Sequence, residues 1–198
     1  MQSQRQGGFS LLEMLTVIAI IGMFVSLSYP ALESMRRRSA VRVLAIELRA
    51  IFHRARSRAI TRSDNTGVKF TRTNEGEWRF TIYDDGDGDG VRNDDINRGV
   101  DRRISMPQPV LNSTAIASIA LPLARIADPD GGWLSTTASA VQFGRSTICS
   151  FSTDGRSTPG TIYISDRGGQ LYALRVFGAT AKIRLLRYHF NAARWEER

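Results

Sequence analysis

"GGFSLLEMLTVIAIIGMFVSLSYP", residues 7–30, is an almost unbroken apolar segment near the start of this 198-residue chain. Between Phe9 and Tyr29 the only carboxylate is Glu13, and there is no basic residue. At about 1.5 Å per residue, a helix of this length matches the hydrocarbon core of a bilayer, which is about 30 Å thick. The sequence therefore predicts a transmembrane helix over residues 9–30. A cleaved secretory signal is disfavoured, because no A-x-A-like exit follows the apolar run.

Glu13 is the unusual residue of this segment. A charged side chain in the middle of a span costs about 2.5–3.5 kcal/mol, so intramembrane acids are expected to have a partner or a function. The alternative is an acid that extends to the headgroups without a further role.

The join between the polar leader and the span carries a specific resemblance. Gly8, then FSLLE over residues 9–13, then an apolar run to Pro30, resembles the class III signal of type IV pilins and type II secretion pseudopilins. The resemblance implies that prepilin peptidase removes leader residues 1–8 by cutting after Gly8 and methylates the new amino terminus, Phe9. It also implies that Glu13 pairs with the amino terminus of a neighbouring subunit during filament assembly, which compensates its charge.

Residues 31–62 continue the helical pattern. Their apolar residues recur every three or four positions, which gives one stripe along a helix that ends near Thr61. Nine arginines stand against Glu33 and Glu47, so this segment carries +7 of the formal net charge of +8. The sequence predicts an amphipathic stem helix whose stripe lies on a sheet. The stripe consists of Val41, Leu44, Ala45, Leu48, Ile51, Phe52, Ala55 and Ala59.

The basic face of the stem has three interpretations. It is a solvated face or one that meets acidic loops of neighbouring subunits, or residues 36–38 contact phospholipid headgroups. The third is DNA binding, for which arginines without interleaved aromatics supply phosphate affinity but no base readout.

Residues 63–198 form the predicted globular domain. Apolar residues alternate with polar ones over 68–70 and 78–82, on either side of the turn 74–76, which predicts a β-hairpin. Turn signals separate the later runs. One long helix followed by mostly antiparallel strands defines an α+β, pilin-like fold. The later runs are 141–143, 148–151, 162–164, 171–177 and 183–188.

The C-terminal part carries a second resemblance. FSTDGRS at 151–157, GTI at 160–162 and TAKIR at 180–184 resemble the GspH/FimT branch of minor pseudopilins and minor pilins. This implies a minor pseudopilin of a type II secretion system, assembled into or capping a periplasmic pseudopilus with other pilins. The alternative is a FimT-like minor pilin of a type IV pilus that binds DNA in natural transformation. Ala181 and Lys182 stand where FimT-type proteins often have glycine and arginine, which weakens the nucleic-acid interpretation.

The charges flanking the span conflict with this resemblance. Only Arg5 precedes the span, whereas residues 36–38 and Arg42 follow it, so the positive-inside rule places the domain in the cytoplasm. The resemblance implies a single-pass protein of the bacterial inner membrane with residues 63–198 in the periplasm. We follow the resemblance, since whole domains translocate despite their charge.

"DDGDGDGVRNDD", residues 84–95, resembles a calcium-binding loop. Its carboxylates occupy positions one, three and five of an EF-hand-like pattern, but position twelve is Ile96 rather than glutamate. No flanking helices are expected. The alternatives are an acidic, mobile hairpin tip and a loop that docks to a basic partner. The candidate Ca²⁺ ligands are Asp85, Asp87, Asp89 and Asn93.

Enzymatic chemistry finds little support in the sequence. The single cysteine, Cys149, leaves no internal disulfide or CxxC site. His53 and His189 belong to no metal or triad spacing, and P-loop, dinucleotide and nucleophile-elbow motifs are missing. We expect an assembly protein that requires no cofactor.

The cleavage assignment predicts the behaviour of a Gly8→Val variant. The branched side chain crowds the approach of prepilin peptidase to the backbone, so the leader should stay attached. Intact-mass spectrometry measures this directly. Wild-type protein that retains Met1 in cells containing the peptidase would contradict the assignment.

Overall fold

The computed structural model describes residues 10–129, 131–134 and 139–198. Gly8 and Phe9 lie outside the described residues. The chain divides into two compact units, one up to Arg36 and the other Arg37–Arg198.

The first unit consists of the first part of helix α1 (Leu11–Arg62). One 18-residue window of this helix has a mean hydropathy of 2.2, so by length and composition it is able to cross a membrane. Pro30 lies inside the helix without ending it. Two serine hydroxyl groups of this segment bond within the helix: Ser26 donates to the Met23 carbonyl and Ser28 to the Phe24 carbonyl, both at 2.8 Å. Such bonds satisfy these two donors on an otherwise apolar surface.

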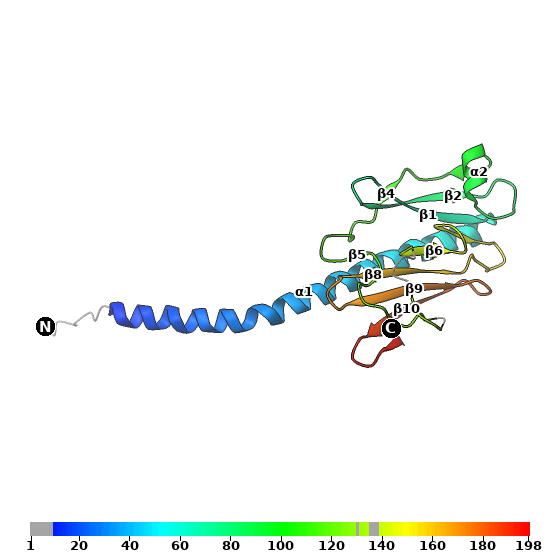
Figure 1. Cartoon of the computed structure of the whole chain (residues 1–198). Helices are drawn as coiled ribbons and strands as arrows, with labels where there is room; N and C mark the ends of the chain where they lie inside the picture. The colour runs from blue at the N-terminus through cyan, green and yellow to red at the C-terminus, as the bar shows by residue number, and fades with distance from the viewer. Residues whose placement is uncertain (1–9, 130, 135–138) are drawn as a thin grey trace. The chain divides into compact units, whose positions relative to one another are not determined.

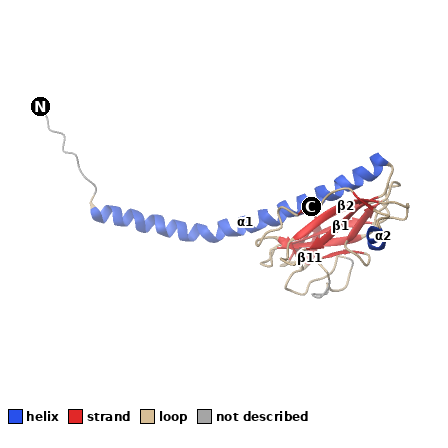
Figure 2. Cartoon of the chain, turned by 90° about the horizontal axis from the view of Figure 1, so that it is seen from above, coloured by secondary structure: helices blue, strands red, loops and turns tan. Residues whose placement is uncertain are grey.

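In the second unit, α1 buries one stripe of its surface. The stripe confirms the residues expected from the three- and four-residue spacing, from Val41 to Ala59. Arg54 and Ile60 on the same helix stay exposed. Figure 2 shows this part of α1 along one side of the strands. The periodicity of apolar residues therefore decided which helix face meets the sheets.

The first sheet has the strand order β3-β2-β1-β7, and β4 also pairs with β2. The predicted hairpin is confirmed: β1 and β2 pair antiparallel around residues 73–77, with Phe70 opposite Phe80. Its strands are β1 (Thr66–Arg72), β2 (Trp78–Asp84), β3 (Arg102–Arg103), β4 (Gln108–Pro109) and β7 (Ile148–Phe151).

The second sheet has the order β11-β10-β9-β8-β5, and β6 also pairs with β8. All strand pairs of the described residues are antiparallel, as expected for the α+β class. Figure 1 shows β8, β9 and β10 as neighbours. Its strands are β5 (Ser118–Ile119), β6 (Val141–Phe143), β8 (Gly160–Ser165), β9 (Leu171–Phe177), β10 (Lys182–His189) and β11 (Arg194–Glu197).

Phe52 of α1 connects the helix to both sheets. Its ring lies 5.8 Å from that of Phe70 and 6.0 Å from that of Phe151, both in the first sheet. The ring of Phe143, in the second sheet, lies 5.6 Å away. The pairs with Phe70 and Phe143 are edge-to-face, and such pairs add about 0.5–1.5 kcal/mol each beyond the area that they bury. One side chain of the helix thus packs against both sheets.

A second core covers the other face of the second sheet. Ile126 and Leu134, in the connection after β5, pack there with Tyr163 and Tyr188. The indole N–H of Trp195 donates to the Ala127 carbonyl at 2.8 Å, which attaches β11 to this connection. This connection lacks a regular apolar period, so its sequence predicted no helix or strand.

Helix α2 (Asn93–Arg98) corrects the expectation that no helix flanks the acidic loop. Asp94 and Asp95 lie in its first turn and Arg98 in its last, where each charge interacts favourably with the helix dipole. Gly99 follows in the left-handed conformation and closes the helix with N–H bonds to carbonyls of the last turn. Five of its six residues are polar and the sixth is Ile96, so there is no apolar period and end signals alone specify this helix.

Phe52→Ala should strongly destabilise the second unit. The substitution removes the ring contacts with both sheets and leaves a cavity, which costs about 3–5 kcal/mol of unfolding free energy. Urea unfolding of the full chain in detergent, followed by tryptophan fluorescence, measures the loss. Ile60→Ala, at an exposed position of the same helix, should change stability by less than about 0.5 kcal/mol. Equal unfolding midpoints for the two variants would contradict the central role of Phe52.

Candidate functional site

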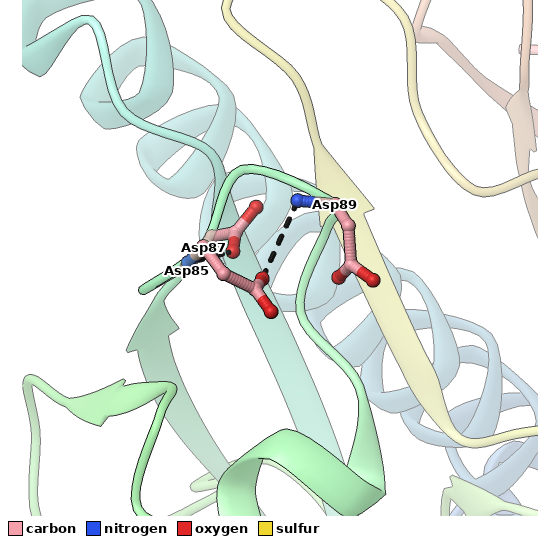
Figure 3. A group of neighbouring side chains, drawn as sticks. All are labelled: Asp85, Asp87 and Asp89. Carbon is pink, nitrogen blue, oxygen red and sulfur yellow. Dashed lines mark hydrogen bonds between the residues drawn. The ribbon is translucent and has the colours of Figure 1, made fainter.

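The acidic loop, residues 85–92, connects β2 to α2. Figure 3 shows Asp85, Asp87 and Asp89 on successive parts of it. One carboxylate oxygen from each lies within 4.8 Å of the others, so the structure brings together three of the four proposed ligands. Asn93, the fourth, is the first residue of α2.

Asp85 organises the loop from inside. One carboxylate oxygen accepts the backbone N–H groups of Asp87 at 3.1 Å and Gly88 at 2.9 Å. The other accepts the N–H of Gly90 at 2.6 Å and the side-chain amide of Asn65 at 2.7 Å. Burial acts to raise the pKa of Asp85, but these donors outweigh it and hold the pKa below its usual range.

Two glycines allow this tight path. A Cβ on Gly86 would lie 2.0 Å from the carbonyl oxygen of Val100, so only glycine fits there. Gly90 has a φ of +92°, in the region that favours glycine. The N–H of Val91 then donates to the Ser150 hydroxyl at 3.1 Å, which anchors the end of the loop to β7. Hydrogen bonds from the protein's own groups therefore hold the loop backbone in this path.

Asp87 and Asp89 stand at the outer side of the loop. Both are exposed, and the Asp89 N–H donates to the Asp87 carboxylate at 3.5 Å, the dashed line in Figure 3. Partial desolvation, and next the charge of Asp89, raise the pKa of Asp87. Arg92 forms an ion pair with Asp89. A cation at this site would compete with the guanidinium of Arg92 for Asp89.

Asp84, at the end of β2, pairs with the stem helix. The Arg58 guanidinium donates to its two carboxylate oxygens at 2.9 and 2.7 Å, a bidentate contact. This hydrogen bonding holds the pKa of Asp84 below its usual range despite burial. One arginine of the basic stem thus binds a carboxylate of its own chain. The sequence contained no signal for this pairing.

Glu13 lies in the first turn of α1 and its side chain is exposed. Met14 begins the helical ladder by donating to the Ser10 carbonyl at 3.1 Å. The proposed cleavage and methylation residues lie just before the described part of the chain. The role of Glu13 in filament assembly stays a prediction.

The groups capable of covalent or acid–base chemistry are dispersed. Cys149 is fully buried in the main core, and burial raises the pKa of its thiol well above the usual value. His53 lies on α1, where burial, then Arg49 and Arg56, lower its pKa. His189 contacts Glu196 at 2.7 Å on another strand pair. Within the described ranges, these residues form no catalytic constellation.

A long helix with an apolar first part and a second part packed on antiparallel sheets defines a pilin-like protein. Residues 3–29 match the model of the prokaryotic N-terminal methylation motif. Residues 44–180, more than half of the chain, match the model of the type II transport protein GspH. The chain belongs to the GspH family and is a minor pseudopilin of a type II protein secretion system. The comparisons with curated proteins and with solved structures found no match.

The family membership bears on the alternatives left open by the sequence. The FimT-like interpretation has no better support than the pseudopilin interpretation. The family is one of structural, pilin-like subunits rather than enzymes.

The hydrogen bonds of the acidic loop predict opposite effects of two substitutions. Asp85→Ala should destabilise the second unit by about 1–3 kcal/mol, even in the presence of a chelator, because four donors lose their acceptor. Asp87→Ala should change stability by less than about 0.5 kcal/mol, since its side chain is exposed. Thermal unfolding of the full chain in detergent with EDTA compares them. Equal effects of the two variants would contradict the assignment of Asp85.

We propose that the same loop binds Ca²⁺ through Asp87 and Asp89, and the same assay tests it. Saturating calcium, at about a hundredfold excess over Kd, adds about 2.7 kcal/mol to the wild type and raises Tm by several degrees. Magnesium should do less, because it demands octahedral geometry. The double variant Asp87→Ala and Asp89→Ala should lose the calcium effect. Identical wild-type melting curves in calcium and EDTA would exclude the ion.

Proposed function

We propose that this subunit is inserted in the bacterial inner membrane by a single span and places residues 63–198 in the periplasm. There it joins or caps the pseudopilus beside other pilin-like subunits. Prepilin peptidase prepares it by removing residues 1–8 and methylating Phe9. Its work is mechanical: the helix enters the filament core, and the sheets face outward.

The observation that carries this proposal is the division of α1. Up to Arg36 its apolar side chains are exposed, including Leu11, Leu15 and Phe24. Apolar surface of this extent in water is unfavourable, so it calls for lipid or for equivalent helices of other subunits. From Val41 onward the apolar stripe is buried by the chain's own sheets. One helix thus serves an intermolecular contact with its first part and an intramolecular one with its second.

The proposed role of Glu13 follows from its position. In the hydrocarbon region a lone carboxylate is costly, whereas a carboxylate paired with the amino terminus of a neighbour is compensated. Because an unpaired Glu13 is costly, each incoming subunit would be most stable at the position along the filament axis where Glu13 meets the amino terminus of its neighbour.

Glu13→Ala should separate membrane insertion from assembly. Insertion stays normal because the variant removes a polar group from lipid, but filament recovery should fall by at least tenfold because the neighbour's amino terminus loses its partner. Membrane fractionation measures insertion, and shearing followed by immunoblotting measures assembly.

Two further variants make the result specific to charge at this position. Glu13→Gln keeps the size of the side chain and should fail like Glu13→Ala. Glu33→Ala removes a carboxylate elsewhere on α1 and should assemble normally. Equal recovery of Glu13→Ala and wild type in sheared filaments would refute the pairing role.

A further inference from the structure

One end of the second unit lies where its part of α1 begins. Arg37, the first residue of that unit, lies beside the β8–β9 turn, because a Cβ on Gly168 would be 3.3 Å from an Arg37 guanidinium nitrogen. A pocket of about 560 Å³ connects this turn to the β1–β2 turn, since Arg167 of the first turn and Arg72 of the second both line it. We call this surface the entry rim. The entry rim consists of residues 72–77, 121–123 and 166–170.

The entry rim carries positive charge at its pocket. Arg72 and Arg167 are exposed, and neither forms an ion pair with any residue that the structure describes. The described residues that line the pocket include no acid. Outside the pocket, Glu77 pairs with Arg79 at 3.6 Å, so Glu75 is the one exposed rim carboxylate without an ion pair among the described residues. Two unpaired guanidinium groups therefore stand against one carboxylate.

The β8–β9 turn gives Arg167 a rigid support. The Asp166 carboxylate accepts the backbone N–H groups of Gly168 and Gln170, both at 2.8 Å. The backbone N–H of Arg167 donates to the Ser165 hydroxyl at 2.9 Å. Arg167 has a φ of +55°, in the left-handed region where a side chain costs conformational energy. The hydrogen bonds of the turn offset this cost and keep an exposed guanidinium at a fixed place on the rim.

An exposed apolar side chain accompanies the two arginines. Leu123 is 75% exposed and lines the same pocket, together with Leu121 and Pro122. Guanidinium groups bind phosphate in a bidentate manner, and an exposed leucine gains free energy by leaving water. Phosphate directly above hydrocarbon is the chemistry of a phospholipid surface, so the rim fits a bilayer whose lipids are anionic.

The place of the rim along the chain also favours lipid. Helix α1 is continuous between Pro30, the end of the predicted span, and Arg37, which is about 10 Å at 1.5 Å per residue. The headgroup layer extends about 5–7 Å beyond the hydrocarbon core. The attraction of an anionic surface reaches a further Debye length, about 8 Å at physiological salt. The β8–β9 turn beside Arg37 is therefore within reach of the headgroups where the span ends.

We propose that the entry rim docks on anionic phospholipids of the periplasmic leaflet before the subunit joins a filament. Arg72 and Arg167 bind headgroup phosphates, and Leu123 enters the boundary between headgroups and acyl chains. The inference rests on the proposed insertion by a single span and adds a second membrane contact, which the sheets make instead of the helix. Entry into a filament would require release of this contact.

Quenching by lipid headgroups tests the docking in a membrane. The full chain is reconstituted in vesicles of phosphatidylcholine, with or without phosphatidylglycerol, and each vesicle contains the same share of headgroup-spin-labelled phosphatidylcholine. A fluorophore is attached through Ala115→Cys near the rim or through Thr153→Cys far from it. The native Cys149 is fully buried and stays unlabelled.

The two label positions differ in their distance from the rim. Ala115 is exposed in the connection between β4 and β5, whose ends bond to Trp78 and Ser165, the residues that flank the two turns of the rim. Thr153 is exposed and follows β7, whose last residue pairs with Thr66 at the end of β1 away from the rim. That end is about 20 Å from the rim at about 3.3 Å per residue.

Phosphatidylglycerol should bring the rim to the headgroups. It should increase the quenching of the Ala115 label about twofold or more, with little change at the Thr153 label, because anionic lipid attracts the arginines. About 0.5 M salt should abolish the increase, since it screens the exposed charges. The rim variant, Arg72→Gln with Arg167→Gln, should lose most of the increase.

Two further variants make the result specific to the rim. Arg103→Gln with Arg145→Gln removes two exposed arginines without a described ion pair, on β3 and near the acidic loop, and should behave like the wild type. Glu75→Gln removes the carboxylate of the β1–β2 turn and should increase quenching in phosphatidylglycerol vesicles. General damage to the fold would produce no such gain.

Three results would overturn the inference. The first is equal quenching of the two labels in phosphatidylglycerol vesicles, and the second is an increase that the rim variant retains. The third is loss of the rim variant from sheared filaments while its quenching stays like that of the wild type, which would make a neighbouring protein the occupant. Failure of the docking would leave the proposed function standing, because Glu13→Ala tests the filament core independently.

Discussion

The fold depends on the burial of one helix stripe against two sheets that do not continue into each other. The sheets share no ladder among the described strands, and the helix packs against both of them. Phe52 sits at the junction and contacts aromatic rings on both sides. Without that stripe, each sheet would expose an apolar face to water. The acidic loop also depends on this arrangement, since Asn65, just after α1, donates to Asp85.

The spacing of apolar residues along the sequence was sufficient to predict the helix and the strands that form this core. The stripe from Val41 to Ala59, the first hairpin and the later strands follow directly from periods of 3.6 and two, because their burial is one-sided. The short elements α2, β3, β4, β5 and β11 escaped prediction. Tertiary contacts specify them: β11 is attached through Trp195 to a connection that is far away in sequence.

The residues that make up the candidate site were predictable from the sequence, but the separate role of each residue was not. The spacing of Asp85, Asp87 and Asp89 correctly indicated that their carboxylates meet. It gave equal roles to the three, whereas the structure makes Asp85 an internal acceptor and leaves the other two outside. The pairing of Asp84 with Arg58 depends on where β2 ends relative to the helix, which no local pattern encodes.

The direction of the buried stripe has a mechanical consequence. The stripe runs along α1 from Val41 to Ala59, about 27 Å at 1.5 Å per residue. A pull along the axis of this part of α1 therefore loads this packing in shear, so that many side-chain contacts and the Arg58–Asp84 ion pair must break together. Peeling a strand from a sheet edge would break bonds one at a time. A load directed along this part of the helix is thereby shared by the whole stripe.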